Sequence, residues 1–135
     1  MRLFAGAGSG IINFPPELFP LEGFMGVHDA PTAKVFLIEC GERAALISME
    51  LVMLPPTYID EIKSVVSRFT KTPKEHIWVH TTHAITTPHA PHAPMGMGGV
   101  ALEISAEDRK NMSVKMELYH DAVFSAVEEA AATAA

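Results

Sequence analysis

Histidines concentrate in one short segment of the chain. Five of the seven lie within residues 76–92, and these are His76, His80, His83, His89 and His92. Neutral imidazole is a common protein ligand for zinc and similar divalent metals. The spacing contains neither an HExxH motif nor a cysteine-containing zinc pattern. The cluster therefore indicates either a metal site of no standard type or a polar loop whose histidines cap backbone groups.

One carboxylate interrupts an apolar run. Glu50 lies inside the segment 46–54, which is otherwise apolar apart from Ser48. Because burial of a lone carboxylate costs free energy, we expect Glu50 to reach a partner, a metal or the end of a sheet. The alternative is a strand residue that faces outward.

The elements that would position these side chains include two apolar runs around a glycine turn. Ala33–Cys40 and Ala44–Met53 flank Gly41 and predict a β-hairpin. Their nearly continuous apolar composition predicts that both faces of the strands are buried. Trp78 belongs to a third predicted strand over His76–Thr81 and is expected to be buried as well.

A helix is predicted between the second and third strands. Apolar residues recur at helical spacing over Thr57–Phe69, and Thr57 is placed to cap the first turn. A strand, a helix and a strand in this order make the two strands parallel. Ligands of open α/β sheets bind beyond the carboxyl ends of such strands, which is where His80 and His83 lie.

Two segments are rich in glycine and proline. Residues 1–33 are predicted to form short extended pieces and turns. Within them, Gly6–Gly10 is interpreted as a flexible turn rather than a phosphate loop, since no strand precedes it. Residues 82–99 are predicted to be an irregular loop, and a loop of this length in a compact domain is usually functional or disordered.

The C-terminal segment predicts a long amphipathic helix. One stripe of the helix is apolar and is formed by Met112, Met116, Tyr119, Val123, Val127 and Ala130. The sequence leaves open whether the helix begins at Ser105 or at Ser113. It runs to the last residue without a capping glycine, so we expect that the polypeptide was cut or that another chain is its partner.

The length favours one domain over residues 1–135, which the order of predicted elements makes α/β, and the composition excludes several other classes. A hydrophobic content of 48% excludes global disorder, and the single cysteine, Cys40, excludes a disulfide framework. Ten Lys and Arg against sixteen Asp and Glu, a net charge of −6, argue against a nucleic-acid surface. No apolar run approaches the roughly 18–20 residues of a membrane helix, and we read no signal peptide. The lone thiol favours a cytoplasmic location.

Six segments, taken in order along the chain, are similar to a known family. They are Gly6–Gly10, Ile12–Pro16, Gly23-Phe24, Gly26–Val35, Ser48–Glu50 and Thr82–Pro88. In this order they resemble the N-terminal part of the neutral/alkaline non-lysosomal ceramidase family and its smaller bacterial relatives. The resemblance implies an α/β fold around a mixed sheet, as an incomplete part of a larger catalytic domain. This agrees with the hairpin, the strand-helix-strand crossover and the long C-terminal helix that the residue pattern predicts.

The last of these segments resembles the family motif Thr-His-Thr-His-Ser-Gly-Pro. The first histidine of that motif is a zinc ligand, so the resemblance gives this role to His83. The second histidine of the motif is Ile85 in this chain, and Ser-Gly is replaced by Thr86-Thr87, whereas Pro88 is retained.

The resemblance implies a zinc-dependent hydrolase that acts on an amide (C–N) bond of a small molecule. The remaining zinc ligands of the family lie downstream of the matched region, so we expect a second polypeptide or a homo-oligomer to complete the domain. The candidate residues are His83 and His92 for the metal, His80 and His89 for catalysis, and His28, Asp29 and Glu50 as further site residues. The alternative is a non-catalytic metal- or partner-binding module of the same fold.

Overall fold

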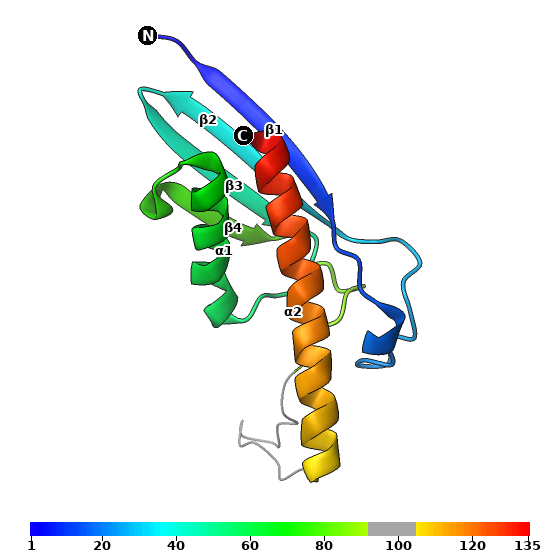
Figure 1. Ribbon diagram of the computed structural model, residues 1–135. Helices are drawn as coiled ribbons and strands as arrows, with labels where there is room; N and C mark the ends of the chain where they lie inside the picture. Colours follow the sequence, from blue (N-terminus) through cyan, green and yellow to red (C-terminus); the bar gives the residue numbers. More distant parts are fainter. Residues whose placement is uncertain (92–104) are drawn as a thin grey trace.

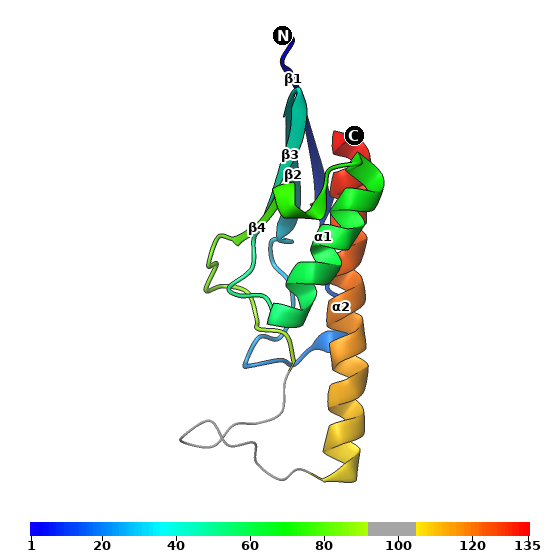
Figure 2. The ribbon, with the colours of Figure 1, turned by 90° about the vertical axis from the view of Figure 1, so that its left-hand side faces the viewer.

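The computed structural model describes residues 1–91 and 105–135, which form a mixed sheet with two helices on one of its faces (Figures 1 and 2). The four strands lie in chain order, β1 (Phe4–Ile11), β2 (Thr32–Cys40), β3 (Glu42–Met49) and β4 (Ile77–Thr81). The pairs β1–β2 and β2–β3 are antiparallel, whereas β3 and β4 are parallel. The predicted α/β fold with a mixed sheet is confirmed.

The first helix makes the crossover between the two parallel strands. α1 spans Pro56–Thr70, within one residue of the predicted range at either end. Thr57 does not cap it, because the capping position is Pro55 and no side chain bonds to the first-turn amides. Proline just before and inside the first turn is preorganised for helical geometry and has no amide hydrogen to satisfy, so the helix begins without a capping side chain.

The second helix extends to the end of the chain. α2 spans Ala106–Ala134, and the Ser105 hydroxyl accepts a hydrogen bond from the Asp108 amide at 3.1 Å. A capping serine supplies an acceptor for an otherwise unpaired amide, so the helix begins at Ser105 and not at Ser113. No helix in the described ranges is long and apolar enough to cross a bilayer.

The glycine-rich N-terminal segment is a regular strand, and the prediction of a flexible turn there is wrong. β1 contains Gly6, Gly8 and Gly10, which face α2. A Cβ atom at these three positions would lie 2.4, 2.1 and 2.1 Å from the carbonyl oxygens of alanines on the helix. These alanines are Ala134, Ala130 and Ala126, in that order. The glycines therefore allow the backbones of β1 and α2 to approach closely, and this contact forms only in the folded chain.

The face of the sheet opposite the helices is open, so the prediction of burial on both faces is wrong. The strand register places Ala7, Phe36, Leu46 and Trp78 in one row across this outer face. Phe36 is 46% exposed, Leu46 is 40% exposed and Trp78 is 67% exposed. The sequence predicted the crossover helix and the C-terminal helix but not that both lie on the same face of the sheet (Figure 2).

Replacing Trp78 by alanine should therefore change the free energy of unfolding by only about 0.5 kcal/mol, as is usual for an exposed side chain. The adjacent Ile77 is fully buried, and its replacement by alanine should cost about 2–5 kcal/mol. Urea unfolding of the two variants measures both values. A loss at Trp78 as large as the loss at Ile77 would show that the outer face is covered.

Candidate functional site

A cavity of about 600 Å³ lies at the carboxyl ends of β3 and β4. Its wall comes from residues between Phe14 and Pro31, from Glu50, and from residues between Thr82 and Pro88. Phe14, Phe19, Phe24 and Val27 make part of this wall apolar. The volume lies within the range of about 300–1,000 Å³ that is typical of small-molecule sites. The position agrees with the expectation that ligands bind beyond the ends of parallel strands.

Three of the candidate residues come together on this cavity. His28, Asp29 and Glu50 all line it, although they belong to two separate segments of the sequence. The His28 Nε2 and Asp29 Oδ2 atoms are 4.0 Å apart, and both side chains are almost fully exposed. A contact between two such exposed groups contributes little to stability, and both side chains are accessible to a molecule in the cavity.

Glu50 is held by the first residues of β2. Its Oε2 atom accepts hydrogen bonds from the amide and the hydroxyl of Thr32, both at 2.7 Å, and Lys34 Nζ lies 3.7 Å from Oε1. The Thr32 hydroxyl bond is the largest influence on the Glu50 pKa, which is lowered overall despite the opposing effect of burial. A carboxylate with a lowered pKa is a weak proton acceptor, so Glu50 is suited to supply a fixed negative charge.

Glu50→Gln should remove a pH-dependent contribution to stability. The folded-state pKa of Glu50 lies below its ordinary value of 4.5, so the ionised form stabilises the fold above that pH. We expect the difference in unfolding free energy between the parent chain and Glu50→Gln to be fully present near pH 7. It should shrink as the pH falls below the ordinary value towards the folded-state pKa. Urea unfolding across this pH range measures it.

Glu42→Gln is the matched control, because Glu42 begins β3, the strand that Glu50 follows, and has no side-chain bond within the described residues. It removes a carboxylate at the other end of this strand without removing the bonds to Thr32. A pH-dependent loss in Glu50→Gln no larger than the one in Glu42→Gln would contradict the assignment.

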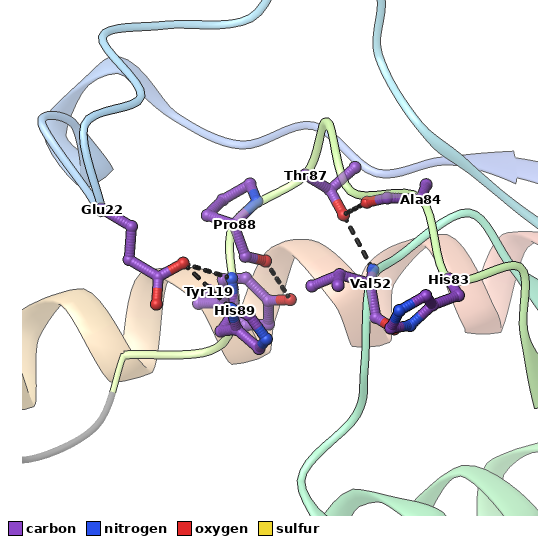
Figure 3. Close-up of polar contacts among 8 residues, drawn as sticks. All are labelled: Glu22, Val52, His83, Ala84, Thr87, Pro88, His89 and Tyr119. Carbon is purple, nitrogen blue, oxygen red and sulfur yellow. Dashed lines mark hydrogen bonds and ion pairs between the residues drawn. The ribbon is translucent and has the colours of Figure 1, made fainter. Parts of the chain in front are cut away.

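His83 lies just past the end of β4 and is turned towards the segment after β3. Its Nδ1 atom donates a hydrogen bond to the Val52 carbonyl at 2.9 Å (Figure 3). A ring nitrogen that donates to a carbonyl carries the proton, so the neutral ring has its lone pair on Nε2. The side chain is exposed, and Nε2 has no partner in the described part of the chain. His83 therefore presents one nitrogen that is ready to accept a metal ion or a proton.

The two candidate catalytic histidines lie in different surroundings. His80 is on the outer face of the sheet, where its Nδ1 atom is 3.2 Å from the Ser48 hydroxyl. His89 is joined to Glu22, whose Oε2 atom accepts from the His89 amide at 3.0 Å and lies 3.1 Å from Nδ1 (Figure 3). A carboxylate partner orients an imidazole and leaves its other nitrogen able to accept a proton.

The candidate metal ligand His92 lies outside the described residues. Within residues 1–91 and 105–135, no three His, Cys, Asp or Glu side chains are grouped so that they could hold a metal ion. A catalytic zinc ion needs about three protein ligands and an open position. The described residues thus offer the His83 imidazole as one fitting ligand and not a complete set.

Two further histidines are placed away from the cavity. His76 precedes β4 at its other end, and its Nδ1 atom bonds to the Arg43 carbonyl at 3.1 Å. His120 lies between the two helices and bonds to Glu61 at 2.8 Å. Burial alone would lower the pKa of His120, but its bonds to Glu61 and Asp121 raise it overall. Both histidines have structural partners within the fold.

Two side chains that were not predicted as site residues fix the segment after β4. The Thr87 hydroxyl accepts from the Val52 amide at 2.8 Å, and the buried Tyr119 hydroxyl donates to the Pro88 carbonyl at 3.2 Å (Figure 3). Burial raises the pKa of Tyr119, so its hydroxyl stays protonated and able to donate. Both partners are backbone groups, which a sequence pattern does not reveal.

Two solved structures share the fold of this chain. One is described as ceramidase complexed with C2, with 17% identity and a TM-score of 0.54. The other is the neutral ceramidase from Pseudomonas aeruginosa, with 17% identity and a TM-score of 0.57. Each match covers 98% of this chain and 22% of the solved chain.

The chain therefore spans about a fifth of the length of these solved chains and has the fold of part of a ceramidase structure. At this level of identity the likeness shows the fold alone, and to that extent it confirms the resemblance noted in the sequence. No protein-family model and no curated protein matches the chain.

Proposed function

We propose that this chain is the N-terminal part or subunit of a zinc-dependent hydrolase that acts on an amide (C–N) bond. The shared fold with two ceramidase structures supports a hydrolase of this kind. The cavity at the carboxyl ends of β3 and β4 supplies a place for a small-molecule substrate. Because the candidate residues lie on different elements, the proposed role of each can be tested by its own substitution.

The main support is the hydrogen bond from His83 Nδ1 to the Val52 carbonyl. Histidines that bind metals usually donate their other ring N–H to a carbonyl or a carboxylate, which fixes the tautomer and the ring orientation. His83 has this arrangement, and the flanking residues Thr82 and Ala84 line the cavity. We propose that Nε2 of His83 is one zinc ligand and that His92 is another.

Zinc, when bound, supplies Lewis-acid polarisation of the amide carbonyl and activation of a water molecule. The protein residues have other tasks. His89, oriented by Glu22, would accept a proton through its free ring nitrogen, and His80 is the second candidate for this role. Glu50 would place a negative charge at the cavity wall, where it can orient a donor group of the substrate.

We propose that the substrate is a small-molecule amide with an apolar group. The aromatic side chains of Phe14, Phe19 and Phe24 make an apolar wall, which favours a hydrocarbon part over a charged one. Thr82 lines the same cavity, and its hydroxyl can bond to an amide. Together they suit a molecule with one apolar and one polar portion.

We further propose that another polypeptide completes the site. The described residues contain no group of three metal-binding side chains, and the solved structures have this fold inside much longer chains. The exposed apolar row on the outer face of the sheet supports the same view, because large exposed apolar patches are typical of interaction surfaces. The isolated chain is therefore expected to be inactive.

A calorimetric zinc titration tests the proposal. The isolated chain should bind zinc weakly, His83→Ala should lose this binding, and His76→Ala should keep it. His76 is a matched control because its Nδ1 atom also bonds to a backbone carbonyl, at the other end of the same strand. Equal zinc affinity in His83→Ala and the parent chain would contradict the metal assignment. Tight stoichiometric binding with amide hydrolysis by the isolated chain would contradict the need for a second polypeptide.

The alternative function is a non-catalytic metal- or partner-binding module. One observation favours it: Ile85 stands where the family motif has its second histidine, and its side chain is 77% exposed. Such a module would bind zinc through His83 in its complete assembly without cleaving any amide. Assay of that assembly against amides with and without an apolar chain separates the two functions.

A further inference from the structure

One hydroxyl group joins the segments that follow β3 and β4. Thr87 Oγ1 accepts a hydrogen bond from the Val52 amide at 2.8 Å and donates one to the Ala84 carbonyl at 2.8 Å (Figure 3). A threonine hydroxyl has a single hydrogen to donate, and here it is directed to Ala84. The Thr87 side chain therefore bonds to both segments at once.

Val52 is bonded on both sides by the segment after β4. Its amide donates to Thr87, and its carbonyl accepts from His83 Nδ1 at 2.9 Å. Val52 itself is 5% exposed, so water is a poor substitute for either partner. The position of the carbonyl that orients His83 thus depends on the bond that Thr87 makes to the same residue.

The backbone at His83 also needs support. Its φ angle is +57°, in the left-handed region that costs free energy for a residue with a side chain. Both neighbours are held, since the Thr82 amide donates to the Met49 carbonyl at 3.0 Å and the Ala84 amide donates to Leu51 at 3.2 Å. The Ala84 carbonyl is held in turn by Thr87. Thr87 therefore contacts the residue after His83 and the residue that His83 bonds to.

We propose that Thr87 is the positioning residue for His83. By holding Val52 and Ala84, it keeps the His83 proton on Nδ1 and directs Nε2 outward as a ligand. The inference rests on the proposed function insofar as the ligand is zinc. Thr87 stands where the family motif has glycine, which has no hydroxyl. The two hydrogen bonds of the Thr87 hydroxyl are therefore a feature of this chain and not of the motif.

Three variants test the role of the hydroxyl. Thr87→Val keeps the shape and removes both bonds, Thr87→Ser keeps the hydroxyl, and Thr86→Val is the matched control at a neighbouring exposed threonine. The first readout is the tautomer of His83 in the metal-free protein at neutral pH, from imidazole nitrogen chemical shifts. We expect a single Nδ1–H tautomer in the parent chain, in Thr87→Ser and in Thr86→Val, and a mixture of tautomers in Thr87→Val.

The second readout is the zinc affinity of the same proteins. Loss of a residue that orients a metal ligand typically lowers metal affinity about 10–100-fold, and we expect this loss in Thr87→Val alone. A single Nδ1–H tautomer of His83 in Thr87→Val would overturn the proposal, whatever the zinc affinity of that variant. If that variant does not fold, Thr87→Ala removes the hydroxyl without adding bulk and is judged by the same two results.

The two readouts separate this inference from the proposed function. If the parent chain shows no zinc at His83, the zinc proposal fails, whereas the tautomer comparison still decides whether Thr87 positions the ring. If zinc binds at His83 but the tautomer does not respond to Thr87→Val, the positioning role fails and the zinc proposal stands.

Discussion

Replacing Gly8 by alanine should lower the free energy of unfolding by about 3 kcal/mol or more, at the upper end of the range for an overpacked contact. The added Cβ would lie 2.1 Å from the Ala130 carbonyl oxygen and 2.6 Å from the Ala134 amide nitrogen. Both atoms belong to the helix backbone, which cannot move aside as a flexible side chain would. The whole of α2 would have to shift away from β1. Urea unfolding measures the loss.

Gly26→Ala is the control for this prediction. Gly26 has no positive φ angle, and a Cβ atom there would meet nothing within 4 Å. Its replacement should change the stability by no more than about 0.5 kcal/mol. Equal stability of Gly8→Ala and Gly26→Ala would show that the backbones of β1 and α2 do not approach each other this closely.

Replacing Tyr119 by alanine should cost about 3–5 kcal/mol, the usual range for removal of a fully buried aromatic ring. The Tyr119 ring stacks on Phe14 with centroids 5.0 Å apart, and its hydroxyl bonds to the Pro88 carbonyl. Tyr119→Phe keeps the ring and should cost about 1 kcal/mol, since it removes only the hydrogen bond. Unfolding experiments on both variants separate packing from hydrogen bonding.

Tyr119 also connects the long helix to the segment that contains His83 and His89. The loss of its hydroxyl should increase amide hydrogen exchange at Thr87, whose amide donates to the Ala84 carbonyl at 3.0 Å. The exchange rate in β2 should not change. Unchanged exchange at Thr87 in Tyr119→Phe would contradict this connection.

Most elements of the fold follow from local patterns. The apolar runs around Gly41 form the β2–β3 hairpin, and the helical spacing in the next segment forms α1. β1 was missed because glycine has a low intrinsic preference for strands. The glycines of β1 are needed because the backbone of α2 lies close against them. That helix is more than a hundred residues away in the sequence, so local sequence patterns do not reveal the contact.

The burial of the sheet shows a second limit of sequence reasoning. An apolar strand is compatible with a sheet that is covered on one face or on both. Trp78 and Leu46 are exposed because α1 and α2 lie on the same face, and the strand sequences contain no signal for this choice. The prediction that Trp78 is buried therefore failed although its strand was located correctly.

The candidate site could be predicted in part. The topology rule that ligands bind at the ends of parallel strands located the cavity, and Glu50 was recognised from its unfavourable position in an apolar run. His80 and His83 are only three residues apart in the sequence, but their side chains lie in different surroundings. The reason is that β4 ends at Thr81 and the chain then turns. The role of Thr87 depends on its bonds to backbone groups, which only the folded structure reveals.

Locating zinc in crystals of this chain grown with the metal tests directly whether His83 binds it. Anomalous scattering at the zinc absorption edge should place an ion about 2.0–2.1 Å from Nε2 of His83, with Nδ1 still bonded to the Val52 carbonyl. An anomalous peak at other histidines only, or no peak beside His83 in the presence of ample zinc, would contradict the proposal that His83 is a zinc ligand.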